Sequence, residues 1–160
     1  MTNVEGEGVG LDMDKSNDLK FMKEAEGEAR LGLKEGGIPI GSILVRGGKI
    51  VGRGHNQRVQ KGNAILHGEM DCLMNAGRQK SYRDTVIYST LCPCFMCSGT
   101  IVQFKIPRVV VGEAVNFPGA PDFLRSQGVE VVILNQTGLI QMMGDFIKAK
   151  PELWNEDIAE

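Results

Sequence analysis

One histidine, one glutamate and two cysteines stand at spacings that suit metal-dependent hydrolysis. His67 and Glu69 are two residues apart, and Cys94 and Cys97 form a Cys-x-x-Cys directly after a proline. Zinc accepts one imidazole and two thiolates in tetrahedral geometry, and three protein ligands leave a fourth position for water. A nearby carboxylate that is not a ligand can move protons to and from that water. The sequence therefore predicts one zinc ion held by the histidine and the two cysteines, with Glu69 as the proton-transfer group.

These motifs constrain where helices must begin. In the middle of a helix, residues two apart point to different sides, so His67 and Glu69 can share a site only at a helix start. We therefore expect a helix over 67–76. A second helix, beginning near Pro93, is predicted by residues three or four apart that share one face: Cys94, Cys97, Ile101 and Phe104. The positive end of that helix dipole would favour thiolates in the first turn.

More ordinary roles exist for the cysteines and for the other histidine. A Cys-x-x-Cys also occurs as a redox pair or as half of a structural zinc site, although the upstream His-x-Glu disfavours both here. Cys72 stands among helical apolar residues, which indicates a buried thiol. Cys92 precedes Cys94 by two residues, and packing at a strand end is favoured over metal binding. His55 is expected to be hydrogen-bonded in a loop rather than to bind a metal.

Composition indicates a globular domain without a membrane or nucleic-acid partner. The chain has 160 residues, of which 42% are hydrophobic and 24% are charged, as in ordinary single domains. No apolar run approaches the ~20 residues that a transmembrane helix needs. The net charge of −2 and the pI near 5.8 disfavour binding to phosphate backbones.

The first residues are rich in Gly, Asp and Glu and contain no apolar core. We therefore expect a flexible tail over 1–15, not a signal peptide, followed by a single domain over 16–160. A cytoplasmic location is expected, in which the four cysteines are ligands or buried thiols rather than disulfides.

Hydrophobic spacing predicts alternating helices and strands. A helix is expected over 16–35, with an apolar face formed by Leu19, Met22, Ala25, Ala29 and Leu33. Strands are expected over 40–45, 49–54, 85–90, 109–111 and 129–134. Further short helices are expected over 121–127, after a cap at Thr137, and from Pro151, with a polar loop over 57–63. This alternation favours one α/β domain with helices on both faces of its sheet.

With the motifs placed, the chain resembles the fungal, yeast-type cytosine deaminases, within the zinc-dependent cytidine and deoxycytidylate deaminase superfamily. The His-x-Glu and Pro-Cys-x-x-Cys motifs are typical of the whole superfamily. Two segments point to the yeast-type branch: Gly-Arg-Gly-His-Asn over 52–56 and Trp-Asn-Glu-Asp-Ile over 154–158. Lys-Glu-Gly-Gly-Ile-Pro-Ile-Gly over 34–41 and Val-Gly-Glu-Ala-Val-Asn-Phe over 111–117 extend the likeness to about nine-tenths of the chain.

The resemblance implies a three-layer α/β/α sandwich around a five-stranded mixed sheet, assembled as a homodimer. It implies hydrolysis of cytosine to uracil and ammonia, in pyrimidine salvage, with one zinc per chain. The implied substrate contacts are Asn56 and the Gly68 amide on the base carbonyl, Glu69 on the ring nitrogen, the Cys92 carbonyl and Asp157 on the amino group, Phe117 and Trp154 over the ring, and Ile40 and Leu91 as apolar walls.

Two departures from the family pattern lie beside the predicted site. Cys92 stands where the family has serine, and Phe95 stands where it has aspartate, which removes a charge. Other functions therefore stay open. One is deamination of another amino-heterocycle, such as guanine, a nucleoside or a tRNA adenosine. The non-enzymatic alternatives are a zinc-stabilised binding module and a redox Cys-x-x-Cys protein.

Overall fold

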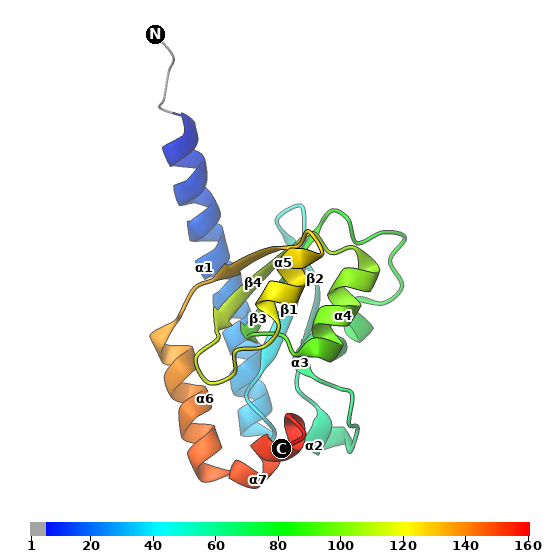
Figure 1. The fold of residues 1–160 in the computed structure, drawn as a ribbon, viewed down its shortest axis with the longest axis vertical. Helices are drawn as coiled ribbons and strands as arrows, with labels where there is room; N and C mark the ends of the chain where they lie inside the picture. Colours follow the sequence, from blue (N-terminus) through cyan, green and yellow to red (C-terminus); the bar gives the residue numbers. More distant parts are fainter. Residues whose placement is uncertain (1–5) are drawn as a thin grey trace.

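A computed structural model of the protein describes residues 6–160, with side chains from residue 15 onward (Figure 1). Helix α1 (Gly6–Lys34) begins earlier in the chain than the expected start at residue 16. The expected flexible tail over 1–15 falls partly on residues 1–5, which lie outside the described part. The predicted division of the chain into a tail over 1–15 and a single domain over 16–160 stays a prediction.

The central sheet has five strands in the order β2-β1-β3-β4-β5. Its members are β1 (Gly41–Arg46), β2 (Lys49–His55), β3 (Thr85–Leu91), β4 (Arg108–Glu113) and β5 (Glu130–Ile133). Strand β1 pairs antiparallel with both β2 and β3, whereas β3, β4 and β5 run parallel. The prediction of a five-stranded mixed sheet is confirmed.

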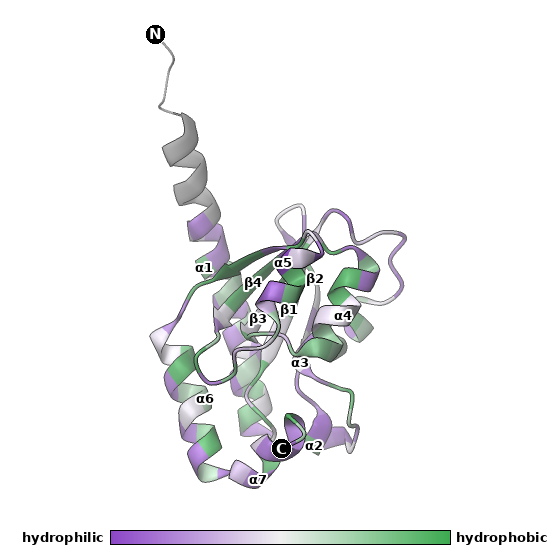
Figure 2. Cartoon of the chain, in the orientation of Figure 1, coloured by the Kyte–Doolittle hydropathy of each residue, from purple (hydrophilic) through white to green (hydrophobic). Residues whose placement is uncertain are grey.

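Helices cover both faces of this sheet. They are α1, α2 (Arg58–Lys61), α3 (Gly68–Ala76), α4 (Phe95–Phe104), α5 (Pro121–Ser126), α6 (Thr137–Ala149) and α7 (Pro151–Asp157). Helices α3, α4 and α5 pack on one face, and α1 and α6 pack on the other, so the three-layer sandwich is confirmed (Figure 1). The short hydrophilic helix α2 lies in the segment that was expected to be a polar loop (Figure 2).

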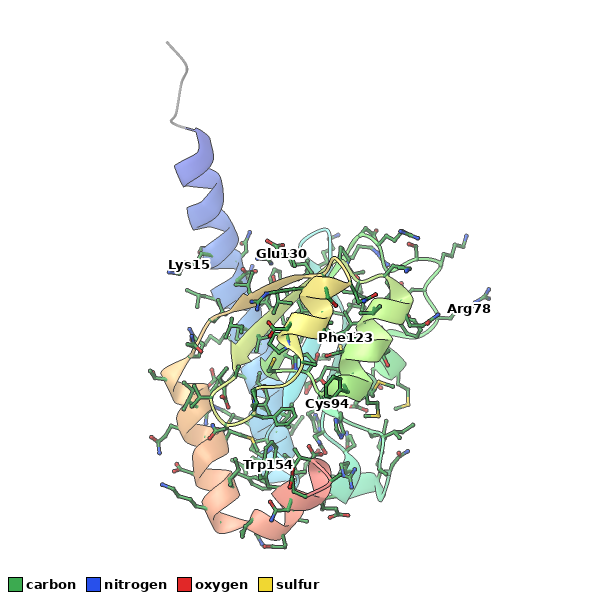
Figure 3. All side chains as sticks on the ribbon, in the orientation of Figure 1. Lys15, Arg78, Cys94, Phe123, Glu130 and Trp154 are labelled. Atoms are coloured by element: carbon green, nitrogen blue, oxygen red, sulfur yellow. The ribbon has the colours of Figure 1, made fainter. Side chains whose placement is uncertain are left out.

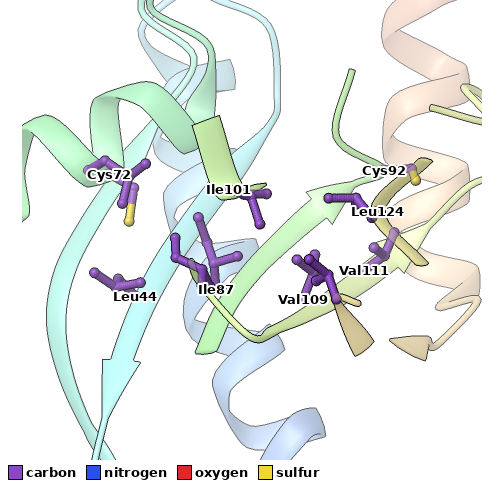
Figure 4. Close-up of a cluster of buried hydrophobic side chains, with 11 residues drawn as sticks. Leu44, Cys72, Ile87, Cys92, Ile101, Val109, Val111 and Leu124 are labelled. Atoms are coloured by element: carbon purple, nitrogen blue, oxygen red, sulfur yellow. The ribbon is translucent and has the colours of Figure 1, made fainter. Parts of the chain in front are cut away.

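Alternation along the strands builds the two halves of the core. Val109 and Val111 of β4 face α4 and α5, whereas Val110 between them faces α1 and α6, as the period of two along a strand requires. Figure 4 shows the first of these clusters, where Ile87 and Leu44 meet side chains from α3, α4 and α5.

Helix α3 lies unusually close to the backbone of β2. A Cβ added at Gly54 would stand 2.4 Å from the Cys72 nitrogen, and one at Gly52 would stand 2.6 Å from the Ala76 Cβ. Only glycine permits this approach. The two glycines therefore let the backbone of one element rest almost directly on the other.

Three predicted helix starts are wrong by one or two residues. Helix α3 begins at Gly68, and His67, expected as its first residue, is its N-cap. Helix α4 begins at Phe95 rather than near Pro93, and Cys94 is its extended N-cap residue. The Pro93 carbonyl accepts a hydrogen bond from the Ala120 amide at 3.1 Å, which holds Pro93 in the link between β3 and α4. Gln136 precedes α6, so Thr137 is its first helical residue rather than its cap.

The predicted apolar face of α1 is correct in its middle and wrong at its ends. Leu19 and Leu33 are 39% and 40% exposed, whereas Asp18 and Glu28 are buried. Asp18 accepts two hydrogen bonds from the Arg108 guanidinium, at 2.8 and 2.7 Å, and one from the Tyr88 hydroxyl at 2.9 Å. A buried carboxylate with such partners can occupy a core position.

We expect Asp18→Ala to lower the free energy of unfolding by about 3 kcal/mol, because it leaves the half-buried Arg108 and the Tyr88 hydroxyl without their shared acceptor. The exposed pair between Arg53 and Glu24, at 2.8 Å, supplies the control. Glu24→Ala should cost less than about 1 kcal/mol. Urea unfolding followed by circular dichroism measures both values, and equal small losses would contradict the assignment.

Candidate active site

Two helix N-termini meet near the end of strand β3. His67 is the extended N-cap residue of α3, and Cys94 is the extended N-cap residue of α4. Glu69 and Cys97 then fall in the first turns of the same two helices. The helix start that His67 and Glu69 require is therefore present.

The three predicted metal ligands converge. One ligand atom each from His67, Cys94 and Cys97 lies within 4.8 Å of the others. The Cys94 Sγ is 3.5 Å from the His67 Nδ1, and the matching edge of a zinc tetrahedron is about 3.6 Å long. These residues fit zinc in both atom type and spacing. Because Nδ1 faces the sulfurs, the other ring nitrogen, Nε2, faces Asp157 at 3.5 Å.

The electrostatics of this cluster favour a cation. The Cys97 thiol and the His67 ring lower the pKa of Cys94 to about 4, against the opposing effect of burial. Burial lowers the pKa of His67, but its hydrogen bond to Cys94 and the charge of Asp157 outweigh this effect and raise the pKa to about 9. The hydrogen bond to Cys94, together with burial, raises the pKa of Cys97. Zinc binds thiolates and neutral imidazole, so binding of the metal would release the protons that His67, Cys94 and Cys97 share in its absence.

Glu69 lies beside the cluster and is only 3% exposed. Its Oε1 accepts a hydrogen bond of 2.7 Å from the Ser89 hydroxyl, which also lies 2.8 Å from the Leu91 carbonyl. Burial raises the pKa of Glu69. The sequence reasoning missed Ser89, although a polar residue inside an apolar strand was a signal that its side chain has a buried partner.

The cluster opens into a small pocket. Its lining consists of Ile40, His67, Glu69, Leu91, Cys92, Cys94, Phe117, Trp154, Asp157 and Ile158. The space left inside is about 20 Å³, enough for roughly one water molecule. Trp154 meets Phe117 edge to face, with ring centroids 5.9 Å apart. Cys94 and Trp154 lie toward the same end of the molecule (Figure 3).

Comparison with known proteins identifies the family. Residues 15–113 match the model of the cytidine and deoxycytidylate deaminase zinc-binding region. A cytosine deaminase of Candida albicans is 50% identical over 147 residues, which cover 90% of this chain and 98% of that protein. The chain belongs to this deaminase family. The predicted resemblance to the yeast-type branch is confirmed, and so is the expectation of a zinc site.

More distant relatives of this deaminase act on other substrates. A tRNA-specific adenosine deaminase of Streptococcus pyogenes is 41% identical over 107 residues, covering 65% of this chain and 67% of that protein. The solved structure of a tRNA A34 deaminase superposes with a TM-score of 0.62 at 25% identity, over 72% of this chain and 97% of that one. The guanine deaminase of Nitrosomonas europaea, at 16% identity and a TM-score of 0.65, covers 78% of this chain and 81% of that one, and supports the fold alone.

Six of the eight residues expected at the substrate line the pocket of the deaminase, whereas Asn56 and Gly68 are next to lining residues but not part of the lining. Asn56 is fully buried, and its amide donates to the Asp157 Oδ1 at 2.9 Å. Gly68 packs close to the carbonyl of Ile40. Ile158 also lines the pocket, although the sequence reasoning gave it no role.

The other cysteines and the second histidine behave as expected, apart from the position of His55. Cys72 and Cys92 are buried outside the ligand cluster, and burial raises the pKa of each to about 12. His55 ends β2 instead of lying in a loop, and its ring nitrogens contact Glu28 at 3.2 Å and Glu35 at 2.6 Å.

Over residues 6–160, no helix is both long enough and apolar enough to span a membrane.

We expect the purified protein to carry about one zinc per chain, as a three-ligand site requires. Cys97→Ser should lose most of this metal after dialysis, because one of the three ligands is gone. Cys92→Ser is the matched control and should keep it, since Cys92 lies outside the cluster. Metal analysis by mass spectrometry measures all three proteins, and metal loss from the Cys92 variant would refute the ligand assignment.

Proposed function

We propose that this protein hydrolyses cytosine to uracil and ammonia, with His67, Cys94 and Cys97 holding zinc and Glu69 moving protons. The observation that carries the proposal is a buried carboxylate that borders the ligand cluster without belonging to it. A purely structural zinc site has no need of such a group. The 50% identity to a cytosine deaminase gives independent support.

Glu69 has the surroundings of a proton carrier. When bound, zinc supplies an activated water beside this carboxylate. Glu69 would carry a proton from the attacking water to the ring nitrogen of the base, and would later deliver a proton to the leaving ammonia. Burial raises the pKa of Glu69, which strengthens it as a proton acceptor. Ser89 fixes the carboxylate by holding its Oε1.

The pocket walls suit a flat ring with one amino group and one carbonyl. Ile40 and Leu91 offer apolar surface, and Phe117 and Trp154 supply aromatic surface above the ring. Asp157 would accept from the exocyclic amino group together with the Cys92 carbonyl.

The base carbonyl would receive hydrogen bonds from the Asn56 side chain and the Gly68 amide. One hydrogen of the Asn56 amide group already points to Asp157. The amide group has two hydrogens, so the second stays available for the base. This arrangement would let Asn56 bridge the substrate and Asp157.

The outer surface beside the site supports a homodimer as part of the proposal. Phe95 is 76% exposed and meets Phe123, with ring centroids 6.5 Å apart. Exposed aromatic residues next to one another are typical of protein interfaces. A second copy of the chain would cover this surface.

We further propose that the enzyme works in the cytoplasm, in pyrimidine salvage.

Glu69→Gln should retain zinc and the folded state while kcat for cytosine falls by a factor of about 10²–10⁴ or more, because the proton carrier is lost. Glu130→Gln, at an exposed position, is the matched control and should keep normal turnover. Ammonia release and metal content measure the outcome. Near-normal turnover in the Glu69 variant would place the general base elsewhere.

The intact protein should deaminate cytosine and leave cytidine, guanine, single-stranded DNA and tRNA adenosine essentially untouched. The reason is that Trp154 and Asp157 line this small pocket and, once they close over a bound base, would leave no room for a ribose. Ammonia release across this panel of substrates measures the preference. A preference for cytidine or for tRNA adenosine would overturn the substrate assignment while leaving the zinc chemistry intact.

A further inference from the structure

We propose that Arg58 is a positioning residue that anchors Asp157, and with it helix α7, over the pocket. The inference rests on the proposed function, in which this pocket receives the base. Arg58 lies outside the pocket lining. It therefore acts on the substrate only through the residues that it holds.

Contacts outside α7 already fix Arg58. Its Nη1 donates to the Ala64 carbonyl at 2.7 Å, within the loop that follows α2. Its backbone amide donates to the Asn56 Oδ1 at 3.0 Å. That bond commits the amide oxygen of Asn56 and leaves the amide nitrogen to face Asp157. These two contacts hold Arg58 independently of α7.

The end of α7 docks onto this fixed guanidinium. The Asp157 Oδ1 is 3.7 Å from the Nε of Arg58, and the Glu156 Oε1 is 3.6 Å from its Nη2. The Asp157 side chain is 4% exposed, whereas that of Glu156 is 64% exposed. The C-terminus accordingly lies next to α2 in Figure 1.

A buried carboxylate such as Asp157 needs a nearby positive charge to stay docked. Its two cationic neighbours in the described part of the chain are Arg58 and His67. Arginine stays charged at any working pH, and the Arg58 Nε lies 3.7 Å from the Asp157 Oδ1. Arg58 is therefore a permanent countercharge for Asp157.

The pocket has to widen before a base can enter, because its free space holds roughly one water molecule. Leu91 belongs to a central strand and His67 to a packed helix start, so neither wall can move far. Trp154 and Asp157 both belong to α7. Helix α7 thus carries two of the walls that can move, and Arg58 and Asn56, whose amide donates to the Asp157 Oδ1 at 2.9 Å, supply polar contacts that the motion breaks and restores.

The test compares Arg58→Gln with Arg53→Gln, an arginine whose exposed pair with Glu24 lies away from the pocket. Trp154 is the single tryptophan of the chain, so acrylamide quenching of its fluorescence reports α7 directly. In Arg58→Gln we expect the quenching constant to rise about twofold and KM for cytosine to rise about tenfold, a loss of binding by one decade. The kcat value should change less than KM, and the zinc content should stay at that of the wild type. Arg53→Gln should match the wild type in every measurement.

Arg58→Lys, which keeps the charge but loses the planar fork, should fall between the wild type and Arg58→Gln. If Arg58→Gln does not fold, Arg58→Lys is compared with the wild type and with Arg53→Gln in the same measurements. Unchanged quenching, or unchanged KM, in a folded Arg58→Gln protein overturns the proposal. This holds even if the melting temperature falls, because an arginine that only stabilises the loop after α2 would lower the melting temperature without changing quenching or KM. Quenching needs no substrate, so this readout still decides the role of Arg58 if the wild type fails to deaminate cytosine.

Discussion

The structure depends on bringing several ionisable groups together in a place that excludes water. Glu69 and Cys97 lie in the first turns of two helices, and His67 and Cys94 are the N-cap residues of the same helices. Free amides and the helix dipoles favour negative charge at these positions. Removing such groups from water is costly unless each finds a partner. A divalent cation inside the cluster and hydrogen bonds around it meet that demand. The sheet supports this arrangement, because the chain enters α4 directly from the end of β3.

Polar partners around the site come from parts of the chain that are far apart. Asn56 and Asp157 are separated by 101 residues, yet they share a hydrogen bond at the wall of the pocket. Ser89 reaches Glu69 from the middle of the sheet. Each partner restricts a side chain that would otherwise adopt several rotamers. Asp157 and Glu69 are therefore held before any substrate arrives, and such preorganisation is a main source of catalytic power in enzymes.

Much of this arrangement could be predicted from the sequence. Ligand types and their spacing identified the zinc cluster, and the hydrophobic pattern gave the five strands within a residue or two of their ends. Contacts made through tertiary structure could not be predicted. Asp18 and Glu28 were not among the residues predicted to face the core from α1, and they are buried there because Arg108 and His55 supply their partners. Cys94 proved to be the N-cap residue of α4, because the Pro93 carbonyl accepts a hydrogen bond from the Ala120 amide, just before α5, and the helix begins only after it.

The close approach of α3 to β2 through Gly52 and Gly54 also affects how the sequence can vary. Where two backbones touch, their separation no longer depends on the volume of the side chains between them. The start of α3, which carries His67 and Glu69, is then held at a fixed height above the sheet. Apolar residues elsewhere in the core can change size with little displacement of the metal ligands. The glycines themselves have no such freedom, and any side chain added at either position would lift the helix and separate the two halves of the ligand set.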